Sequence, residues 1–418
     1  PSTIGGEIVK KAGEGLQRAL YAIVRRSLEL GVMASETMED IVSPVHKRNN
    51  PAIESNYRPV SMTDEDNKLM KKILKRWITK WEEEKKGGPH PSSFGAKKNR
   101  DIQMVLVTAK ETVLMQKFRK RRGKVALIVA DVKSAFPSLS REGLAKKFLD
   151  RGMPNWLWKR WWMTVKKLRG RIRIGNIHTD MTEHEEGVNQ GDVMAAEEWG
   201  WFFQDLADDL QATPDGEIVT VGDSKWKPSY LYVDDASILV WVPEEEVQKA
   251  LMSNTAKGKT VKVATGVTKV MRKFAEKNCL NWAKPKLKVM VFGVPEKVQK
   301  QFSVNVAGEE KAGQSEIELL GDVVEADINS ATSKFVKTTK AMRKVGSKIA
   351  WTCSGRKMVT ISTMKLLIES LIVSRIRSGL VTHKVRPSQM KTLDAIMAEV
   401  VKATLGLPTA MSSRLVLI

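Results

Sequence analysis

The sequence predicts an α+β fold built from two or three subdomains. Its 418 residues exceed the size of a single hydrophobic core. Apolar residues recur at helical spacing near both ends of the chain, whereas the middle contains short runs rich in Val, Ile, Leu and Tyr. Helical segments are therefore expected to flank a central part that contains a β-sheet.

Helices are predicted in the first part of the chain. In the first 35 residues, apolar positions from Ile8 to Leu30 follow the spacing of one helix face. Further helices are expected at about 64–86 and 100–120, separated by a Gly/Pro break at GGPHP. The segment PNWLWKRWWMTVKKL predicts another helix, whose clustered tryptophans are expected to pack in the core rather than stack on bases.

Two acidic motifs lie where predicted strands end. The run GKVALIVADVKSAF predicts a buried strand that ends at Asp131. The run SYLYVDDASILV predicts a hairpin with Asp234 and Asp235 between its strands. Asp suits turns, which is one interpretation of this pair. The other is a metal site, because adjacent like charges repel unless a cation lies between them.

The two interpretations differ in what they require of Asp131. If its strand lies beside the hairpin, three carboxylates form a cluster that is costly unless divalent ions occupy it. Mg²⁺ (or Mn²⁺) binds carboxylate, water and phosphate oxygens, and two ions about 3.5–4 Å apart support in-line phosphoryl displacement. Adjacent strands would therefore predict a two-ion site for nucleotidyl transfer.

The charge balance predicts a polyanionic partner. The chain has 70 Lys and Arg against 48 Asp and Glu, a net charge of +22, which favours nucleic acid over an acidic membrane. No apolar run approaches the roughly 18 residues that a membrane span needs, so no membrane partner is expected. Two cysteines outside any CxxC pattern indicate an intracellular, reducing environment.

One basic stretch is expected to be a nucleic-acid-binding helix. Between Lys334 and Lys357 there are eight Lys and Arg and no acid. Helical spacing places Met342 and Ile349 on one face, and the other face has Lys337, Lys340, Lys344 and Lys348. The basic face can follow a phosphate backbone while the apolar face packs. A merely solvated face is the alternative, although such faces usually mix charges of both signs.

Six sequence blocks in a fixed order resemble the reverse transcriptase family. YVDD at 232–235 resembles its YxDD box, and ADVKSAF resembles its first carboxylate motif. The segment SPVHKRNNPAIESNYRPVSM is similar to the fingers block, EGVNQGDVM to the GxPQG box, NWAKPKLKVMVFG to the Lys-bearing segment, and IELLGDVV to the LG hairpin that grips the primer. The stretch LDAIMAEVVKATLGLP resembles the thumb-side end of non-LTR (LINE-type) retrotransposons, so the resemblance spans about residues 35–410.

The resemblance implies a right-hand polymerase fold and an RNA-directed DNA polymerase of a retroelement. Fingers with an N-terminal helical extension would occupy 1–122, and the palm 123–325 with a fingers insertion at about 141–185. A helical thumb would occupy 326–418. The implied partners are an RNA template, a DNA primer or target, and dNTP. Flanking endonuclease or nucleic-acid-binding domains are expected on a longer native polypeptide, and a nuclear location is expected by the same analogy.

The resemblance also implies catalytic roles for individual residues. Asp131 and Asp234 would be the principal ligands of two Mg²⁺ (or Mn²⁺) ions, with Asp235 a weaker ligand. Tyr232 is the first residue of the same box and is expected to bind substrate. Lys286 corresponds to a proposed general acid for the leaving pyrophosphate.

Further residues correspond to the family's nucleotide-binding positions. Lys47 and Arg58 match fingers residues that contact the triphosphate, for which the guanidinium fork is suited. Gln190 and Gly191 match the box that lines the nascent base pair. Phe136, five residues after Asp131, lies where the family has its sugar gate, which favours dNTPs over rNTPs. A core Phe beside a strand is the alternative interpretation of this residue.

Departures from the family pattern keep two other functions open. The usual AFD is Ala-Phe-Pro137 here, an acid follows the box at Asp192, and Ala283 replaces the Asn that commonly precedes the Lys. One alternative is a catalytically silent, domesticated RNA-binding or scaffold protein that retains the fold. The other is an RNA-dependent RNA polymerase, although that family more often has GDD than YVDD. The departures remove no expected metal ligand.

Overall fold

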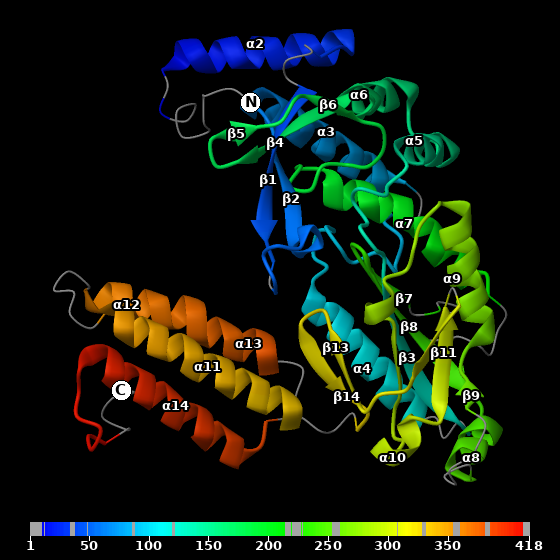
Figure 1. Cartoon of the computed structure of the whole chain (residues 1–418), viewed down its shortest axis with the longest axis vertical. Coiled ribbons are helices and arrows are strands. Elements are labelled where there is room, and N and C mark those ends of the chain that lie inside the picture. Colours follow the sequence, from blue (N-terminus) through cyan, green and yellow to red (C-terminus); the bar gives the residue numbers. More distant parts are fainter. Residues whose placement is uncertain are drawn as a thin grey trace.

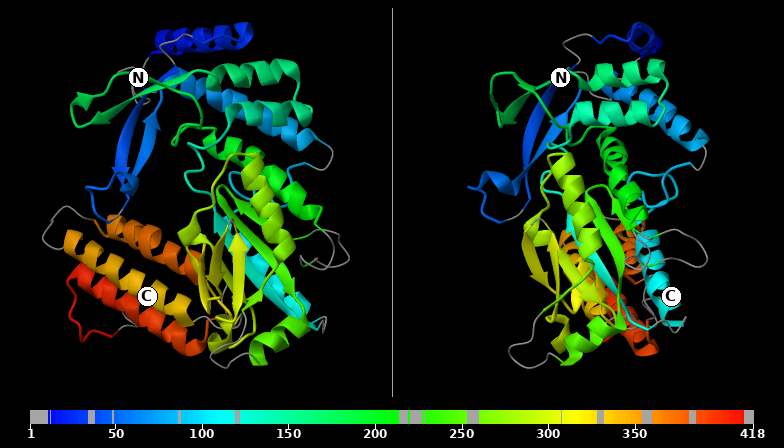
Figure 2. Two further views of the ribbon diagram at one scale, coloured as in Figure 1. Left: turned by 45° about the vertical axis from the view of Figure 1, so that its right-hand side comes forward. Right: turned by 90° about the vertical axis from the view of Figure 1, so that its right-hand side faces the viewer.

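The computed structural model describes most of the chain (Figures 1 and 2). The described residues are 11, 13–33, 38–47, 49–85, 88–118, 122–213, 219, 227, 229–252, 260–306, 308–327, 332–353, 360–380 and 385–412. They form a central antiparallel sheet, a second sheet with its own helices, and a C-terminal helical bundle.

The central sheet has the strand order β10-β3-β8-β7, and all its pairs are antiparallel. Its strands are β10 (Lys288–Val291), β3 (Lys124–Asp131), β8 (Asp235–Val242) and β7 (Ser229–Tyr232). After its first residue, β3 is buried throughout, because both faces of the sheet are covered. The apolar run before Asp131 therefore forms the predicted buried strand, and β7 and β8 form the predicted hairpin.

Different elements cover the two faces of the central sheet. One face packs against α5 (Arg141–Asp150), α7 (Ala195–Gln211) and α9 (Thr265–Lys277), with Phe202 and Phe274 in the shared core. The other face packs against α4 (Ile102–Phe118) and the hairpin of β13 (Glu316–Leu319) and β14 (Asp322–Glu325). The sheet thus lies in the middle of three layers.

Smaller elements complete the central part of the chain. They are α8 (Glu244–Met252), η3 (Lys284–Lys286), α10 (Glu296–Gln299) and a three-stranded sheet of β9 (Val261–Lys262), β11 (Phe302–Val306) and β12 (Glu309–Ala312). Strand β11 packs beside α9 and β10, so this small sheet extends the same core.

The second sheet joins two segments that lie far apart in the sequence. Its order is β2-β1-β4-β5, with β6 also paired to β4. The strands are β1 (Glu39–His46), β2 (Tyr57–Met62), β4 (Leu168–Ile174), β5 (Ile177–His178) and β6 (Thr182–His184), with the short helix η2 (Glu54–Asn56) between β1 and β2. The β1–β4 pair is parallel, with Ile41 opposite Arg171. This pairing attaches residues 168–184 to the N-terminal part of the molecule.

Three helices accompany the second sheet (Figure 1). They are α2 (Glu14–Leu30), α3 (Glu65–Glu84) and α6 (Asn155–Val165). Helices α3 and α4 lie close to the segments predicted at 64–86 and 100–120, and α2 lies within the predicted N-terminal helix, of which Ile8 is outside the described residues. In α6, Trp161 is fully buried and Trp158 and Trp162 pack against the core, as predicted, whereas Trp156 is 51% exposed, so the prediction is wrong for that residue.

The C-terminal bundle has a separate apolar core. It consists of α11 (Thr332–Cys353), α12 (Ile361–Ile368), the π-helix η4 (Glu369–Val373), α13 (Ser374–Leu380) and α14 (Pro387–Leu405). Met342, Ile372 and Ile396 are buried at its centre. The bundle lies beside the β13–β14 hairpin (Figure 1), and buried Lys334 at the start of α11 pairs with buried Asp322 of β14. None of the helices in the described ranges is long and apolar enough to span a membrane.

Candidate active site

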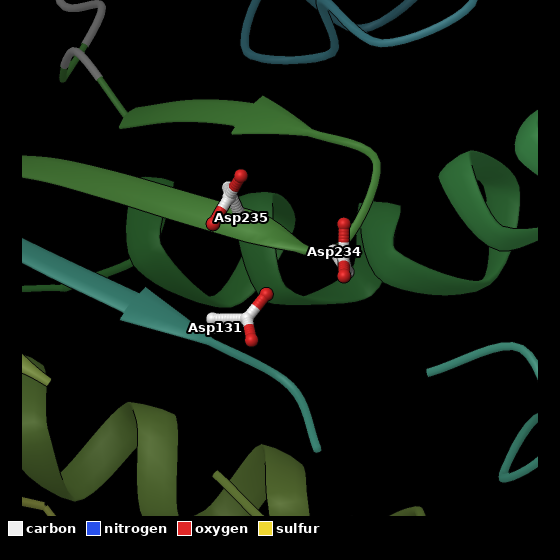
Figure 3. A group of neighbouring side chains, drawn as sticks. All are labelled: Asp131, Asp234 and Asp235. Carbon is white, nitrogen blue, oxygen red and sulfur yellow. The ribbon is translucent and has the colours of Figure 1, made fainter. Parts of the chain in front are cut away.

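Three aspartates meet at one end of the central sheet. Asp131 is the last residue of β3 and lies directly opposite Asp235, the first residue of β8. Asp234 occupies the turn just before β8 (Figure 3). One carboxylate oxygen from each side chain lies within 4.8 Å of the others. We call these three residues the carboxylate cluster.

The turn that presents Asp234 has an unusual backbone. Tyr232 pairs with Asp235, so Val233 and Asp234 form a two-residue hairpin loop. Val233 has φ 55°, a region that β-branched residues rarely adopt and in which Gly is the usual choice for such a loop. Such strain persists only where the surrounding structure holds it, and it is concentrated at functional sites.

A loop from a distant part of the chain supports this hairpin. Phe94 N–H donates to the carbonyl of Leu231 (2.9 Å), and Leu231 N–H donates to the carbonyl of Ser92 (2.8 Å). Gly95 then passes so close that a Cβ there would lie 2.4 Å from the backbone nitrogen of Val233. Residues 92–95 therefore pair with the outer edge of β7 and pack against the strained turn at Val233.

The carboxylate cluster has more negative charge than its neighbours balance. Asp131 is 4% exposed, and its Oδ2 accepts from Lys286 Nζ at 2.5 Å. Burial raises the pKa of Asp131 to about 7, the hydrogen bond from Lys286 opposes this, and Asp234 adds to it. Burial and Asp234 likewise raise the pKa of Asp235 to about 6. One ammonium thus faces three carboxyl groups.

The donor set of the cluster fits a divalent cation. Oδ1 of Asp131 is buried and has no hydrogen-bond partner among the described residues. Carboxylate oxygens are the ligands that Mg²⁺ and Mn²⁺ prefer, and a cation would satisfy this oxygen and offset the mutual repulsion. Asp131, Asp234 and Asp235 are the residues that could hold it.

The Gln190 loop (residues 187–194) connects β6 to α7 and brings other predicted residues together. Its Val188 N–H donates to the carbonyl of Phe136 (2.9 Å), and the carbonyl of Gln190 accepts from Ser61 N–H of β2 (2.8 Å). Gly191 has φ +103°, and a Cβ there would lie 3.0 Å from the carbonyl oxygen of Ser61. Gly is therefore required where the loop crosses β2.

Lys47 and Arg58 lie on the β1–β2 hairpin, on adjacent chain segments. Arg58 is opposite Val45, and Lys47 N–H donates to the carbonyl of Asn56 (2.8 Å). Both side chains are exposed, and neither forms an ion pair with the carboxylate cluster within the described ranges. Lys47 Nζ donates to the carbonyl of Ser55 (3.3 Å), and the hairpin thus presents two exposed cations next to the strand that contacts the Gln190 loop.

Two aromatic residues predicted at the site are partly buried. Phe136 packs against the main core, which its alternative interpretation also expects, and its carbonyl contacts the Gln190 loop. Tyr232 packs on the face of the sheet that α4 covers, directly opposite Asp235. The roles of both remain predictions.

Comparison with known proteins identifies the family. Residues 45–323 match the family model described as reverse transcriptase (RNA-dependent DNA polymerase). The chain belongs to the reverse transcriptase family. Its fold is the α+β right-hand polymerase fold, as predicted, with an antiparallel sheet at its centre. No curated protein sequence matches the chain.

Solved structures with a detectable likeness include yeast telomerases. Candida albicans telomerase in complex with a TWJ fragment of telomeric RNA is 11% identical over 97% of this chain and 67% of its own, with a TM-score of 0.40. The corresponding complex from Candida tropicalis is 10% identical over 96% and 67%, with a TM-score of 0.44. Apo telomerase from Candida tropicalis is 10% identical over 94% and 67%, also at 0.44. Because these TM-scores are low, the assignment to the reverse transcriptase family depends on the family match and not on these structures.

The basic helix of this reverse transcriptase family member has the two predicted faces. In α11, Met342 and Ile349 are buried. The exposed face has Lys337, Lys340, Lys344 and Lys348. Lys337 pairs with Glu318 of β13 at 2.8 Å, and both side chains are about half exposed. Binding of nucleic acid by this face remains a prediction.

A buried ion pair beside the Gln190 loop is not among the features predicted from the sequence. Lys71 of α3 contacts Asp192, and their side chains are 3% and 5% exposed. A signal was present in the sequence, because Lys71 lies at helical spacing among the buried positions Met70, Leu74 and Ile78. A lysine within an apolar stripe and an extra acid in a functional loop together indicate such a partner.

Proposed function

We propose that this chain is the RNA-directed DNA polymerase of a non-LTR retroelement, which extends a primer on an RNA template by two-metal nucleotidyl transfer. The observation that supports it most directly is the carboxylate cluster, whose charge is not balanced by the cations among the described residues. A family fold with three acids at the end of its central sheet suits phosphoryl-transfer chemistry better than a purely structural role.

The proposed division into fingers, palm and thumb follows the three parts of the fold. The fingers comprise residues 1–122 and the insertion at 141–185, which share the second sheet. The palm comprises the rest of 123–325, and the bundle at 326–418 is the thumb. Helix α4 lies within the fingers limits but packs on the palm sheet, so it belongs physically to the palm.

The acids and Lys286 divide the chemistry between them. Asp131 and Asp234, with Asp235, would hold two Mg²⁺ or Mn²⁺ ions. When bound, such ions stabilise the charge that develops at the primer 3′-hydroxyl and at the leaving pyrophosphate. Lys286 holds the carboxylate of Asp131, and its pKa is raised, against burial, by that hydrogen bond and by the neighbouring acids. It therefore stays protonated and is the proposed proton donor to pyrophosphate.

Nucleotide selection would depend on residues of the β1–β2 hairpin, of the Gln190 loop and of the segment after β3. Lys47 and Arg58 contact the triphosphate, and Gln190 and Gly191 line the nascent base pair. Phe136 excludes the 2′-hydroxyl of an rNTP, a role supported by its backbone contact to the Gln190 loop. The exposed lysines of α11 contact the phosphate backbone of the template–primer duplex.

A retroelement origin is the finer part of this proposal. It is supported by the thumb-side stretch from Leu393 to Pro408, which resembles non-LTR elements. This stretch forms the C-terminal part of α14 and the residues that follow it. The proposal includes flanking endonuclease or nucleic-acid-binding domains on the same native polypeptide and nuclear action on a DNA target. A silent scaffold remains the competing function, because Pro137, Asp192 and Ala283 depart from the family pattern.

Primer extension tests the proposal. The chain is incubated with a DNA primer annealed to RNA, Mg²⁺ or Mn²⁺, and either dNTPs or rNTPs, with Asp234→Ala as the inactive control. We expect extension with dNTPs only, its loss in Asp234→Ala, and unchanged duplex binding by that variant. Extension with rNTPs alone would indicate an RNA polymerase. Absence of any metal-dependent extension, with duplex binding intact, would favour the scaffold.

A further inference from the structure

A buried ion pair, to which the family resemblance assigns no role, attaches the Gln190 loop to helix α3. Lys71 Nζ contacts Oδ2 of Asp192, and Oδ1 of the same carboxylate accepts from Met194 N–H at 2.9 Å. Both carboxylate oxygens are therefore engaged, one by the fingers helix α3 and one by the start of α7. These two contacts fix the orientation of the Asp192 carboxylate. Asp192 is the residue directly after Gly191.

The same loop has two more attachments on its other side. Asn189 Nδ2 donates to Oδ2 of buried Asp40 in β1, and the carbonyl of Gln190 accepts from Ser61 N–H of β2. On the α7 side, Lys75 Nζ donates to the carbonyl of Val193 (3.4 Å). The residues on both sides of Gln190 and Gly191 are thus tied to the fingers sheet and to α3.

Stability alone does not account for a buried ion pair at this position. Two apolar residues of similar size would serve packing as well or better, because desolvation cancels most of the attraction between buried charges. An ion pair with a second hydrogen bond differs from apolar packing in being directional. Direction matters here, since Asp192 follows the two residues expected to contact the nascent base pair.

Helix α3, which carries Lys71, follows β2 directly in the chain. The Lys71–Asp192 pair therefore links the Gln190 loop to the strand that carries Arg58. Helix α3 begins three residues after β2, the strand that carries Arg58 and the Ser61 contact. The continuous β2–α3 segment therefore carries both Arg58, the proposed triphosphate contact, and Lys71, which contacts the Gln190 loop. Movement of the Gln190 loop relative to the β2–α3 segment would require the buried Lys71–Asp192 pair to break.

We infer that the Lys71–Asp192 pair is a positioning element that locks the Gln190 loop to the fingers and thereby sets the affinity for the incoming dNTP. The nucleotide part of this inference rests on the proposed polymerase function. The pair touches no reacting group, so it acts through Gln190 and Gly191. Its loss should weaken dNTP binding, whereas the carboxylate cluster and the thumb contacts to the duplex stay in place.

The matched variants are Asp192→Asn and Glu82→Gln. Glu82 also lies on α3 and forms a buried ion pair, with Lys97 at 2.5 Å and side chains 9% and 7% exposed, but it does not contact the Gln190 loop. Each change replaces one buried acid by its amide and removes the carboxylate that contacts a buried lysine. Asp192→Glu, which keeps the charge, serves as the conservative variant, and a Lys71→Met/Asp192→Leu double variant avoids the unpaired charge if Asp192→Asn does not fold.

Hydrogen exchange and steady-state kinetics are measured on the full chain. In Asp192→Asn, we expect faster exchange at 187–194 and at Ser61, and a KM for dNTP raised about tenfold or more with kcat changed far less. Glu82→Gln should leave both unchanged, and Asp192→Glu should restore much of the KM. The double variant, which lacks the directional contact, should show the Asp192→Asn behaviour.

The two readouts separate this inference from the polymerase proposal. Unchanged exchange at 187–194 in Asp192→Asn overturns the lock, whether or not the chain polymerises. Faster exchange with an unchanged KM overturns the link to nucleotide affinity, as does an equal KM effect in Glu82→Gln. If the wild type does not extend primers, the polymerase proposal fails and the exchange comparison still decides whether the pair holds the loop.

Discussion

Acids gather beside the Gln190 loop and at the end of the central sheet, and the two groups differ in how their charge is balanced. Below the loop, Asp192 and Glu197 contact Lys71 and Lys75, and Glu198 accepts from Trp161 Nε1 at 2.8 Å. At the end of the central sheet, the carboxylate cluster has Lys286 as its one ion-pair partner within the described ranges, and the side chain of Lys286 is 62% exposed. The first group is matched by residues that are mostly buried with it.

The difference indicates which charges serve the fold and which are available to a ligand. Burial lowers the pKa of Lys71, but Asp192 and Glu198 raise it, so the net shift is upward and favours the charged ammonium beside these acids. In the carboxylate cluster, burial and mutual repulsion raise the pKa values of Asp131 and Asp235 instead. Asp192→Asn should therefore lower the free energy of unfolding, whereas Asp131→Asn should not.

The largest expected effect separates activity from stability. Asp131→Asn should lower primer extension about a thousandfold, equivalent to ~4 kcal/mol of transition-state stabilisation, because it removes a ligand from the ion site. Measured by urea denaturation in EDTA, its free energy of unfolding should equal or exceed that of the wild type, since one of three repelling charges is gone. A marked loss of stability without metal would mean that Asp131 is a structural acid like Asp192.

The second effect compares two lysines that each contact an acid. Lys71→Met should lower the free energy of unfolding by about 3 kcal/mol, because it leaves buried Asp192 without a counter-charge. Lys286→Met should change it by less than about 1 kcal/mol, since Lys286 is mostly exposed. Urea denaturation of both variants measures the difference. Equal losses would contradict the distinction between matched and unmatched acids.

The third effect is a pH dependence within the matched group. Burial and the neighbouring Asp192 raise the pKa of Glu198 to about 7, against the attraction of Lys71. Because the folded pKa lies above the unfolded value, the contribution of Glu198 to stability is fully present below about pH 4.3 and is lost as pH rises through about 7. Glu198→Gln should therefore match the wild type near pH 4 and exceed it at pH 8, by on the order of 3 kcal/mol.

Thermal or urea unfolding of Glu198→Gln and wild type at several pH values tests this sign. The amide keeps an acceptor for Trp161 Nε1, so packing and the hydrogen bond are retained in the variant. A stability difference that grows towards low pH would mean that Glu198 is held ionised in the folded protein. Glu198 would then need a stronger counter-charge than Lys71 provides.

The sequence predicted the local parts of this site better than its long-range parts. The buried strand before Asp131 and the hairpin at Asp234 follow from short apolar runs, whose periodicity depends on neighbouring residues only. The resemblance then supplied the order of the blocks around them. Lys286 was chosen among many lysines by that resemblance, and the structure places it against Asp131.

The contacts that hold the site depend on pairings that no local pattern specifies. Lys71 and Asp192 lie 121 positions apart, and residues 92–95 pair with β7 across an even longer segment. The strained φ of Val233 was also unforeseen, because Asp, rather than Val, is the residue expected in a turn. Tertiary packing selects these partners, so a sequence shows only that a buried lysine and an extra acid each need one.

The smallest expected effect extends the comparison to the lysines of α11. Lys337 is already paired with Glu318, whereas Lys344 has no ion-pair partner in the part of the chain that the structure describes. If this face binds a phosphate backbone, Lys344→Gln should reduce the slope of log binding constant against log salt by about one, and Lys337→Gln by less. Titrations of an RNA–DNA duplex at several salt concentrations measure both slopes. Equal reductions would show that Glu318 releases Lys337 on binding, and no reduction in either would remove this face of α11 from the duplex contact.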